Sequence, residues 1–363
     1  MRYVKLEEIC FKGVSSLRQK DTLPVGDYPV YGASGICGYL SGYQHNEPYV
    51  AVVKDGAGVG RVQLCSGKSS VLGTLQALLP KDEVSCEYLY EVVRSLELGV
   101  GFTGSTIPHI YFKDYKNRTV VIYEKEQQTK ITTLFTTLKN VVELHKCAIS
   151  FYDELVKSRF VEMFGDPISS LKYSRCLIGD LAVVSSGATP SRKKPEYYEG
   201  TIPWVKTGEV AAGNIDETEE CITEAAIRDS ACRILPAGTI LIAMYGQGDT
   251  RGKSAILNIE AATNQACAAL EFKDEIDARF ALTFLQLCYD DLRNLSQGGN
   301  QKNLNLKIIK EYSMLTPPVY LQKEFANFVA QVDKLKFETQ QSIEKLQMLY
   351  DSLAQEYFAP EGD

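Results

Sequence analysis

The sequence predicts an α+β protein with two mixed, strand-rich domains separated by two long antiparallel coiled-coil helices, arranged as a pseudo-twofold tandem repeat. Two observations predict this fold class. Residues of the first half recur in the second half at a nearly constant spacing, and each half closes with a long apolar pattern at helical spacing. The expected segments are a domain at 1–125, a helix at 126–168, a domain at 169–318 and a helix at 319–363.

The repeat is visible in single residues. Lys113, Lys116 and Gln128 recur 194 residues later as Lys307, Lys310 and Gln322, and Gly104 recurs as Gly298. The spacing drifts only slowly, reaching 198 between Phe160 and Phe358. A period near 190 residues is too long for a solenoid, so it indicates a duplicated domain.

Within each half, strands and a short helix are expected before the long helix. The apolar runs Tyr49–Lys54 and Thr239–Met244 are short and lie close to glycines, which is typical of buried strands. Amphipathic patterns near Glu87–Leu98 and Ala278–Leu292 predict one short helix in each half.

The long helices are predicted from apolar residues at alternating three- and four-residue steps, which place side chains along one seam. Two ordinary core helices are the alternative interpretation. Gly165, followed by Asp166 and Pro167, should end the first helix, because glycine suits the C-terminal cap and proline cannot continue the turn. The increase from a spacing of 194 to 198 predicts a second helix that is four residues longer, with the extra turn at 336–341.

Composition narrows the function. The net charge of −7 requires any DNA contact to use local positive patches. The ten cysteines include no Cys-x-x-Cys pair and there are only three histidines, so we expect reduced thiols and no metal site. The N-terminus has no apolar signal segment and no apolar run approaches the length of a membrane span, which favours a cytoplasmic protein without membrane contact.

Several near-matches to catalytic motifs fail on physical grounds. The run Gly56–Gly60 is not expected to bind a dinucleotide, because the following residues alternate like a strand and do not open a helix. The glycines between Gly246 and Ser254 have the wrong spacing for a phosphate-binding loop. Thr316-Pro317-Pro318-Val319 lacks the polar and aromatic ends of the amino-methyltransferase signature. We therefore expect a protein that recognises its ligand and does not catalyse.

Motifs along the whole chain resemble those of specificity subunits of Type I restriction–modification systems. The strongest is the run FYDELVKSRFVEMFGDP at 151–167. SGATPS at 186–191 and IPWVKTG at 202–208 are similar to motifs of the family's target recognition domains, as are YPVYGASG at 28–35 and TGSTIPH at 103–109. Tyr123-Glu124 departs from the two prolines that usually precede the long helix.

The resemblance implies a non-catalytic subunit that reads a bipartite target in double-stranded DNA. It implies partners as well: two adenine-N6 methyltransferase subunits and restriction-translocase subunits, acting together in host defence. No cofactor is expected in this chain, since S-adenosylmethionine, ATP and Mg²⁺ would be used by the partners. A self-contained DNA methyltransferase and a coiled-coil scaffold that does not bind DNA are the alternatives.

Candidate site residues follow from side-chain chemistry and loop position. The expected DNA-binding residues are Lys54, Arg61, Thr106, Thr189, Ser191, Lys206, Gln247, Arg251, Lys253, Gln301, Lys302 and Asn303. Trp204 is expected in the core and not as a base-stacking platform. The expected partner-docking residues of the long helices are Leu138, Tyr152, Phe160, Leu349, Tyr350 and Phe358.

Overall fold

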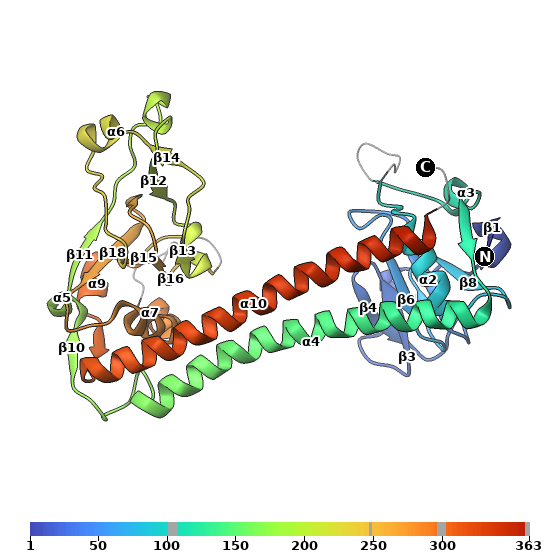
Figure 1. Ribbon diagram of the computed structural model, residues 1–363, viewed down its shortest axis with the longest axis horizontal. Helices are drawn as coiled ribbons and strands as arrows, with labels where there is room; N and C mark the ends of the chain where they lie inside the picture. Colours follow the sequence, from blue (N-terminus) through green and yellow to red (C-terminus); the bar gives the residue numbers. More distant parts are fainter. Residues whose placement is uncertain (101–107, 247–248, 296–302, 360–363) are drawn as a thin grey trace. The chain divides into compact units, whose positions relative to one another are not determined.

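A computed structural model describes residues 1–100, 108–246, 249–295 and 303–359 of the chain (Figure 1). The chain forms two compact units. Unit 1 contains Met1–Cys147 and Thr339–Asp363, and unit 2 contains Ala148–Glu338. The long helices α4 (Lys125–Phe164) and α10 (Val319–Phe358) each contribute one segment to unit 1 and the other segment to unit 2.

Within its described residues, unit 1 contains three sheets and four short helices besides the segments of α4 and α10. Its strands are β1 (Arg2–Lys5), β2 (Cys10–Lys12), β3 (Tyr28–Gly32), β4 (Gly35–Leu40), β5 (Tyr49–Val53), β6 (Val62–Cys65), β7 (Ser70–Val71), β8 (Leu75–Pro80) and β9 (Thr119–Ile122). Its short helices are α1 (Leu6–Ile9), the 3₁₀ helix Gln19–Asp21, α2 (Cys86–Ser95) and α3 (Phe112–Tyr115). The sheet orders are β2-β8-β5-β6, β4-β3-β7 and β1-β9.

The central strand β5 explains the apolar run that predicted it. Val50 and Val52 point into the core that α2 and the long helices close, while Ala51 and Val53 point into a second core beneath β3 and β7. Because successive side chains of a strand face opposite sides, a strand buried on both faces is apolar throughout. The first core is completed by Phe135 of α4 together with α10 residues.

Unit 2 has the same plan. Its strands are β10 (Arg175–Leu177), β11 (Ala182–Ser186), β12 (Ile202–Val205), β13 (Asn214–Ile215), β14 (Cys221–Ile222), β15 (Ile240–Ala243), β16 (Ser254–Leu257), β17 (Ala262–Thr263), β18 (Cys267–Phe272) and β19 (Ser313–Leu315). Its helices are α5 (Ile178–Leu181), α6 (Glu224–Asp229), α7 (Ala278–Leu287), α8 (Tyr289–Asn294), α9 (Leu306–Lys310) and the 3₁₀ helices Pro195–Tyr198 and Glu209–Ala212. The predicted helix at 278–292 is two helices, which meet at Cys288.

The sheets of the two units correspond strand by strand. The order β11-β18-β15-β16 of unit 2 matches β2-β8-β5-β6 of unit 1, and both are antiparallel throughout. The order β14-β12-β17 matches β4-β3-β7, and in both the last pairing is parallel. Among the residues that the structure describes, unit 2 adds one edge strand, β13, parallel to β16, to these sheets. The mixed helix and strand content expected from the sequence is confirmed.

The expected difference in length between the long helices is wrong, because α4 and α10 both contain 40 residues. The ends of the helices explain this. Four helical residues follow Phe160 in α4, and the helix ends at Gly165, which has φ +83°. Helix α10 ends at Phe358, the residue that repeats Phe160, two positions before Pro360. Proline cannot continue a helix, so α10 gains four residues internally and loses four at its end.

Candidate nucleic-acid interface

In the first domain, two of the expected DNA-binding cations lie at the two ends of one loop. Strand β5 ends at Val53, so Lys54 begins the loop, and Arg61 ends it just before β6. Arg61 is exposed and its Nη1 donates a hydrogen bond to the carbonyl oxygen of Ala33 at 3.1 Å. Lys54 is half-buried, and no ion pair of its side chain occurs within the described ranges. The loop therefore carries two cationic side chains together with the carboxylate of Asp55.

The glycines of this loop serve its shape. Gly60 has φ +82°, and a Cβ at this position would collide with the backbone of Leu98 and Gly99. The chain then enters strand β6 and not a helix, as predicted, so Gly56–Gly60 does not form a dinucleotide-binding turn.

The equivalent loop of the second domain joins β15 to β16 and carries Arg251 and Lys253. Both side chains are half-buried. The carbonyl oxygen of Arg251 accepts a hydrogen bond from Nη1 of Arg293 at 3.2 Å, which ties the loop to α8. Lys253 lines a cavity of about 300 Å³ beside Tyr289.

Four expected DNA-binding residues, Thr106, Gln247, Gln301 and Lys302, lie outside the described residues. Asn303 is described and half-buried. Thr189 and Ser191 are exposed in the loop that follows β11. The Thr189 hydroxyl donates a hydrogen bond to Oε1 of Gln265, so this side chain is already engaged within its own domain.

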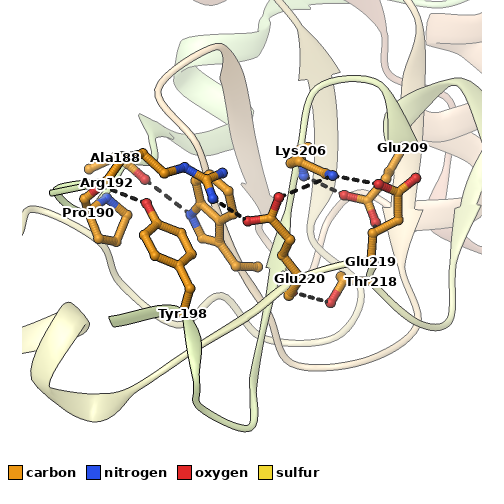
Figure 2. A network of polar contacts seen from close by, with 10 residues as sticks. Ala188, Pro190, Arg192, Tyr198, Lys206, Glu209, Thr218, Glu219 and Glu220 are labelled. Atoms are coloured by element: carbon orange, nitrogen blue, oxygen red, sulfur yellow. Dashed lines mark hydrogen bonds and ion pairs between the residues drawn. The ribbon is translucent and has the colours of Figure 1, made fainter. Parts of the chain in front are cut away.

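Lys206 is held by carboxylates, as Figure 2 shows. Its ammonium group forms ion pairs with Glu219 and with Glu220, the latter at 3.3 Å, and its backbone N–H donates to Oε2 of Glu209 at 2.6 Å. The hydrogen bond to Glu219 raises the pKa of Lys206. A phosphate that approached this lysine would therefore have to replace existing carboxylate partners.

The same network contains Arg192, a residue that our interpretation of the sequence missed although it directly follows the Thr-Pro-Ser motif. Nη1 of Arg192 contacts Oε2 of Glu220 at 2.7 Å, so Glu220 bridges Arg192 and Lys206 (Figure 2). The guanidinium lies over the Tyr198 ring at 4.0 Å from its centroid and 5.3 Å from that of Trp204. The contact with Arg192, and after it that with Lys206, holds the pKa of Glu220 below its ordinary value.

Trp204 is a core residue, as predicted. Its side chain is buried among Tyr197, Ile222 and Ala262, and its Nε1 donates a hydrogen bond to the carbonyl oxygen of Ala188 at 3.2 Å. The ring thus anchors the loop that carries Thr189, Ser191 and Arg192.

The expected docking residues of the long helices need correction. Leu138, Tyr350 and Phe358 belong to the core of unit 1, and Phe160 is fully buried in the core of unit 2. These four pack α4 and α10 against their domains and offer little surface to a partner, although Leu138 and Tyr350 also line a pocket of about 530 Å³. Leu349 is 47% exposed and Tyr152 is half-buried, so these two remain accessible.

Other apolar side chains of the long helices lie on the surface, and the sequence pattern did not separate them from the buried stripe. The largest exposed fractions are those of Phe151 and Met348, both at 71%, and Tyr320 at 70%. Leu144 of α4 and Phe337 of α10 are also exposed. Exposed apolar residues that gather on one element mark interaction surfaces.

Among the described residues, no group of three or more histidine, cysteine, aspartate or glutamate side chains could hold a metal ion. No helix in the described ranges is long and apolar enough to cross a membrane.

Comparison with known proteins gives one family for most of the chain. The family described as "Type I restriction modification DNA specificity domain" matches residues 1–150 and 173–348. The MjaIX specificity subunit, of a Type I restriction enzyme of Methanocaldococcus jannaschii, is 29% identical over 163 residues. These residues are 44% of this chain and 37% of the relative, so the match spans well under half of that protein.

Two solved structures have a similar fold. The S subunit of a Type I restriction-modification system from M. genitalium matches with a TM-score of 0.61 at 16% identity, covering 99% of this chain and 96% of that one. A chain from a study of complex assembly and conformational transition of the type I R-M system matches with a TM-score of 0.65 at 15% identity, covering 98% and 97%.

Proposed function

The chain belongs to the family of Type I restriction modification DNA specificity domains, and from this premise we propose that it reads a bipartite DNA target for a methyltransferase complex. The repeated domain carries the proposal. Each unit has the same sheet order, and the corresponding loops β5–β6 and β15–β16 each carry two cationic side chains. Two similar readers in one chain suit a target made of two recognised parts with unread base pairs between them.

We further propose that the chain has no catalytic site and that adenine-N6 methyltransferase subunits, two for each copy, dock on the long helices. Restriction-translocase subunits would join the same complex. S-adenosylmethionine, ATP and Mg²⁺ would be bound by these partners. The exposed apolar residues of α4 and α10 support the docking proposal, because apolar side chains at the centre of an interface contribute most of its affinity.

We infer that α4 and α10 pair as an antiparallel coiled coil. Within unit 2, Arg159 contacts Glu324 at 3.1 Å and Lys336 contacts Asp153, so rising numbers in α4 meet falling numbers in α10. In unit 1, Phe135 contacts Tyr350, with ring centroids 4.7 Å apart. Supercoiled pairing would make both helices shared supports of the two readers.

The reading function is tested by co-expressing the full chain with its methyltransferase partner and sequencing the methylated adenines. We expect one motif of two short parts separated by a fixed number of unread bases. The chain alone, supplied with S-adenosylmethionine, should leave DNA unmethylated. Methyl transfer by the chain alone would favour a self-contained methyltransferase, and a complex without any sequence preference would contradict the proposal.

The docking surface is tested by Phe151→Asp combined with Met348→Asp, one change from each unit. Both side chains are exposed, so the fold should survive while co-purification of the methyltransferase is lost. Phe151→Leu combined with Met348→Leu is the matched control, because it keeps the surface apolar and should retain the partner. Normal co-purification of the aspartate variant would move the docking site elsewhere.

A further inference from the structure

Arg192 is fixed in place before any ligand arrives. Its side chain is 54% exposed, yet it contacts Glu220 at 2.7 Å and stacks on Tyr198 at 4.0 Å. The Tyr198 hydroxyl donates to the carbonyl oxygen of Pro190 at 2.6 Å, and Trp204 donates to that of Ala188. Both rings are therefore tied to the loop that carries Arg192, and the entropy of ordering this long side chain is already lost.

The guanidinium keeps donors for a further partner. A guanidinium has five N–H groups in a planar fork, and the contact with Glu220 uses Nη1. Among the described residues, no hydrogen bond occupies its Nε or Nη2, so these N–H groups are available to a ligand. Arginine so held can offer a bidentate pair of donors to a planar acceptor.

The surrounding charge disfavours phosphate as that acceptor. The network of Figure 2 contains two cations, Arg192 and Lys206, against the three carboxylates of Glu209, Glu219 and Glu220, a formal charge of −1. A phosphate at Arg192 would compete with the internal carboxylate of Glu220. A neutral acceptor edge meets no repulsion from this carboxylate. In the major groove, guanine offers the acceptors O6 and N7 at the spacing of an arginine fork.

We infer that Arg192 is a specificity-determining residue that reads a guanine through O6 and N7, with Glu220 as the positioning residue that holds its guanidinium. The inference rests on the proposed reading of DNA and adds to it a residue and a base. It separates the roles of neighbouring cations: Arg192 selects a base, whereas Lys193, which is exposed and forms no ion pair within the described ranges, can meet phosphate.

The test selects binding sites from a randomised duplex library with the full chain in complex with its methyltransferase partner. Wild type should select a motif with a guanine that Arg192→Ala no longer requires. Replacing that G·C pair should weaken wild-type binding by about 5- to 150-fold, and should change the binding of Arg192→Ala by less than about twofold. Arg192→Lys keeps the charge but loses the planar fork, so it should lose the same discrimination. Glu220→Gln should lose part of it.

Salt dependence distinguishes a base contact from a phosphate contact. The slope of log affinity against log salt should be unchanged in Arg192→Ala, whereas the loss of a phosphate contact lowers it by about one. Lys193→Ala is the control and should leave the selected motif intact. If Arg192→Ala lowers this slope by about one and leaves the selected motif unchanged, the role inferred for Arg192 is wrong, while the proposed function still stands. A wild-type complex that selects no motif would instead refute the proposed function. Thermal unfolding of each variant shows whether the domain remains folded.

Discussion

Units 1 and 2 each use a glutamine at the equivalent position to connect the domain to its long helix. Oε1 of Gln128 accepts a hydrogen bond from the backbone of Ser85, the N-cap of α2, and its Nε2 donates to the carbonyl oxygens of Glu83 and Tyr123. Gln322 repeats all three contacts with the backbone of Asp277, Glu275 and Pro317, and Asp277 is the N-cap of α7. Both amides are buried.

The charged contacts between the same elements differ. In unit 1, Glu91 of α2 has a side chain only 5% exposed, forms an ion pair with Lys139 of α4 at 2.7 Å, and accepts a hydrogen bond from the Tyr350 hydroxyl. Burial, and after it this hydrogen bond, raises the pKa of Tyr350.

In unit 2, the position that repeats Lys139 is Asp333, and its partner is Arg279 of α7 at 3.8 Å. The polarity is reversed and both side chains are more exposed than Glu91. Both units therefore keep the hydrogen bonds between a neutral glutamine amide and backbone groups, because backbone groups do not depend on the neighbouring side chains. The charged pairs next to these hydrogen bonds have diverged.

Removing either of these two buried glutamine side chains should have the largest effect on stability. Gln128→Ala and Gln322→Ala each remove three hydrogen bonds between a buried side-chain amide and the backbone, at about 1 kcal/mol per bond, so we expect each to cost about 3 kcal/mol. The two losses should agree within about 1 kcal/mol. Urea unfolding of the full chain measures them, and hydrogen exchange shows which unit loosens. The exposed Gln347→Ala is the control, with less than about 0.5 kcal/mol expected. A large loss of unfolding free energy in one unit and none in the other would show that the two glutamines do not have the same role.

Removing the divergent pairs should have unequal effects. Lys139→Ala leaves the buried carboxylate of Glu91 without its cation, and we expect a loss of about 2 kcal/mol. Asp333→Ala breaks a half-buried pair with a long contact of 3.8 Å and should cost less than about 0.5 kcal/mol. Adding Glu91→Gln to Lys139→Ala should recover part of the loss, because no unpaired charge then remains. Equal losses of stability in the two units, measured by the same urea titration, would contradict the conclusion that their charged pairs differ in strength.

The smallest effect concerns Glu220, whose side chain is half-buried whereas that of Glu91 is buried. Its folded-state pKa is lowered from 4.5, chiefly by Arg192. A lowered carboxyl pKa contributes stability above the unfolded pKa and loses it as the pH falls through the folded pKa. The difference in Tm between wild type and Glu220→Gln should therefore be present at pH 7, shrink as the pH falls below 4.5, and vanish once the pH is below the lowered folded-state pKa. A difference that persists there would mean that the side chain acts through packing and not through its charge.

Much of the fold could be predicted because its signals are local. The apolar runs of β5 and β15, the stop of α4 at Gly165 and the duplication itself were visible in the sequence. The burial of Phe160 and Tyr350 was not, because each long helix carries two apolar stripes and periodicity alone cannot say which one faces a domain. The lengths of α4 and α10 depended on their last turns, where the repeat itself breaks down.

The candidate site was harder to predict because its partners are distant in the chain. Lys206 was predicted to bind DNA, but Glu219 and Glu220, which directly precede strand β14, form ion pairs with it. Arg192 was overlooked because its importance comes from two rings and a carboxylate that only the fold assembles. A signal existed: the arginine adjoins the exposed Thr-Pro-Ser loop, which is a position where a basic residue can meet DNA.

Unit 1 is formed by two segments that lie far apart in the sequence, and this affects when it can fold during synthesis. Its first 147 residues need Thr339–Asp363 to complete their core, because Tyr350 and Phe358 cover Phe135. About 190 residues separate these parts, and a ribosome adding about 5–20 residues per second needs about 10–40 s to make them. During that interval the apolar face of α4 in unit 1 lacks its α10 partner residues. Unit 2 is continuous in sequence and can complete its core first. The first domain to be made is thus the last to be finished, and the nascent chain must be protected at Phe135 and Leu138 until its end emerges.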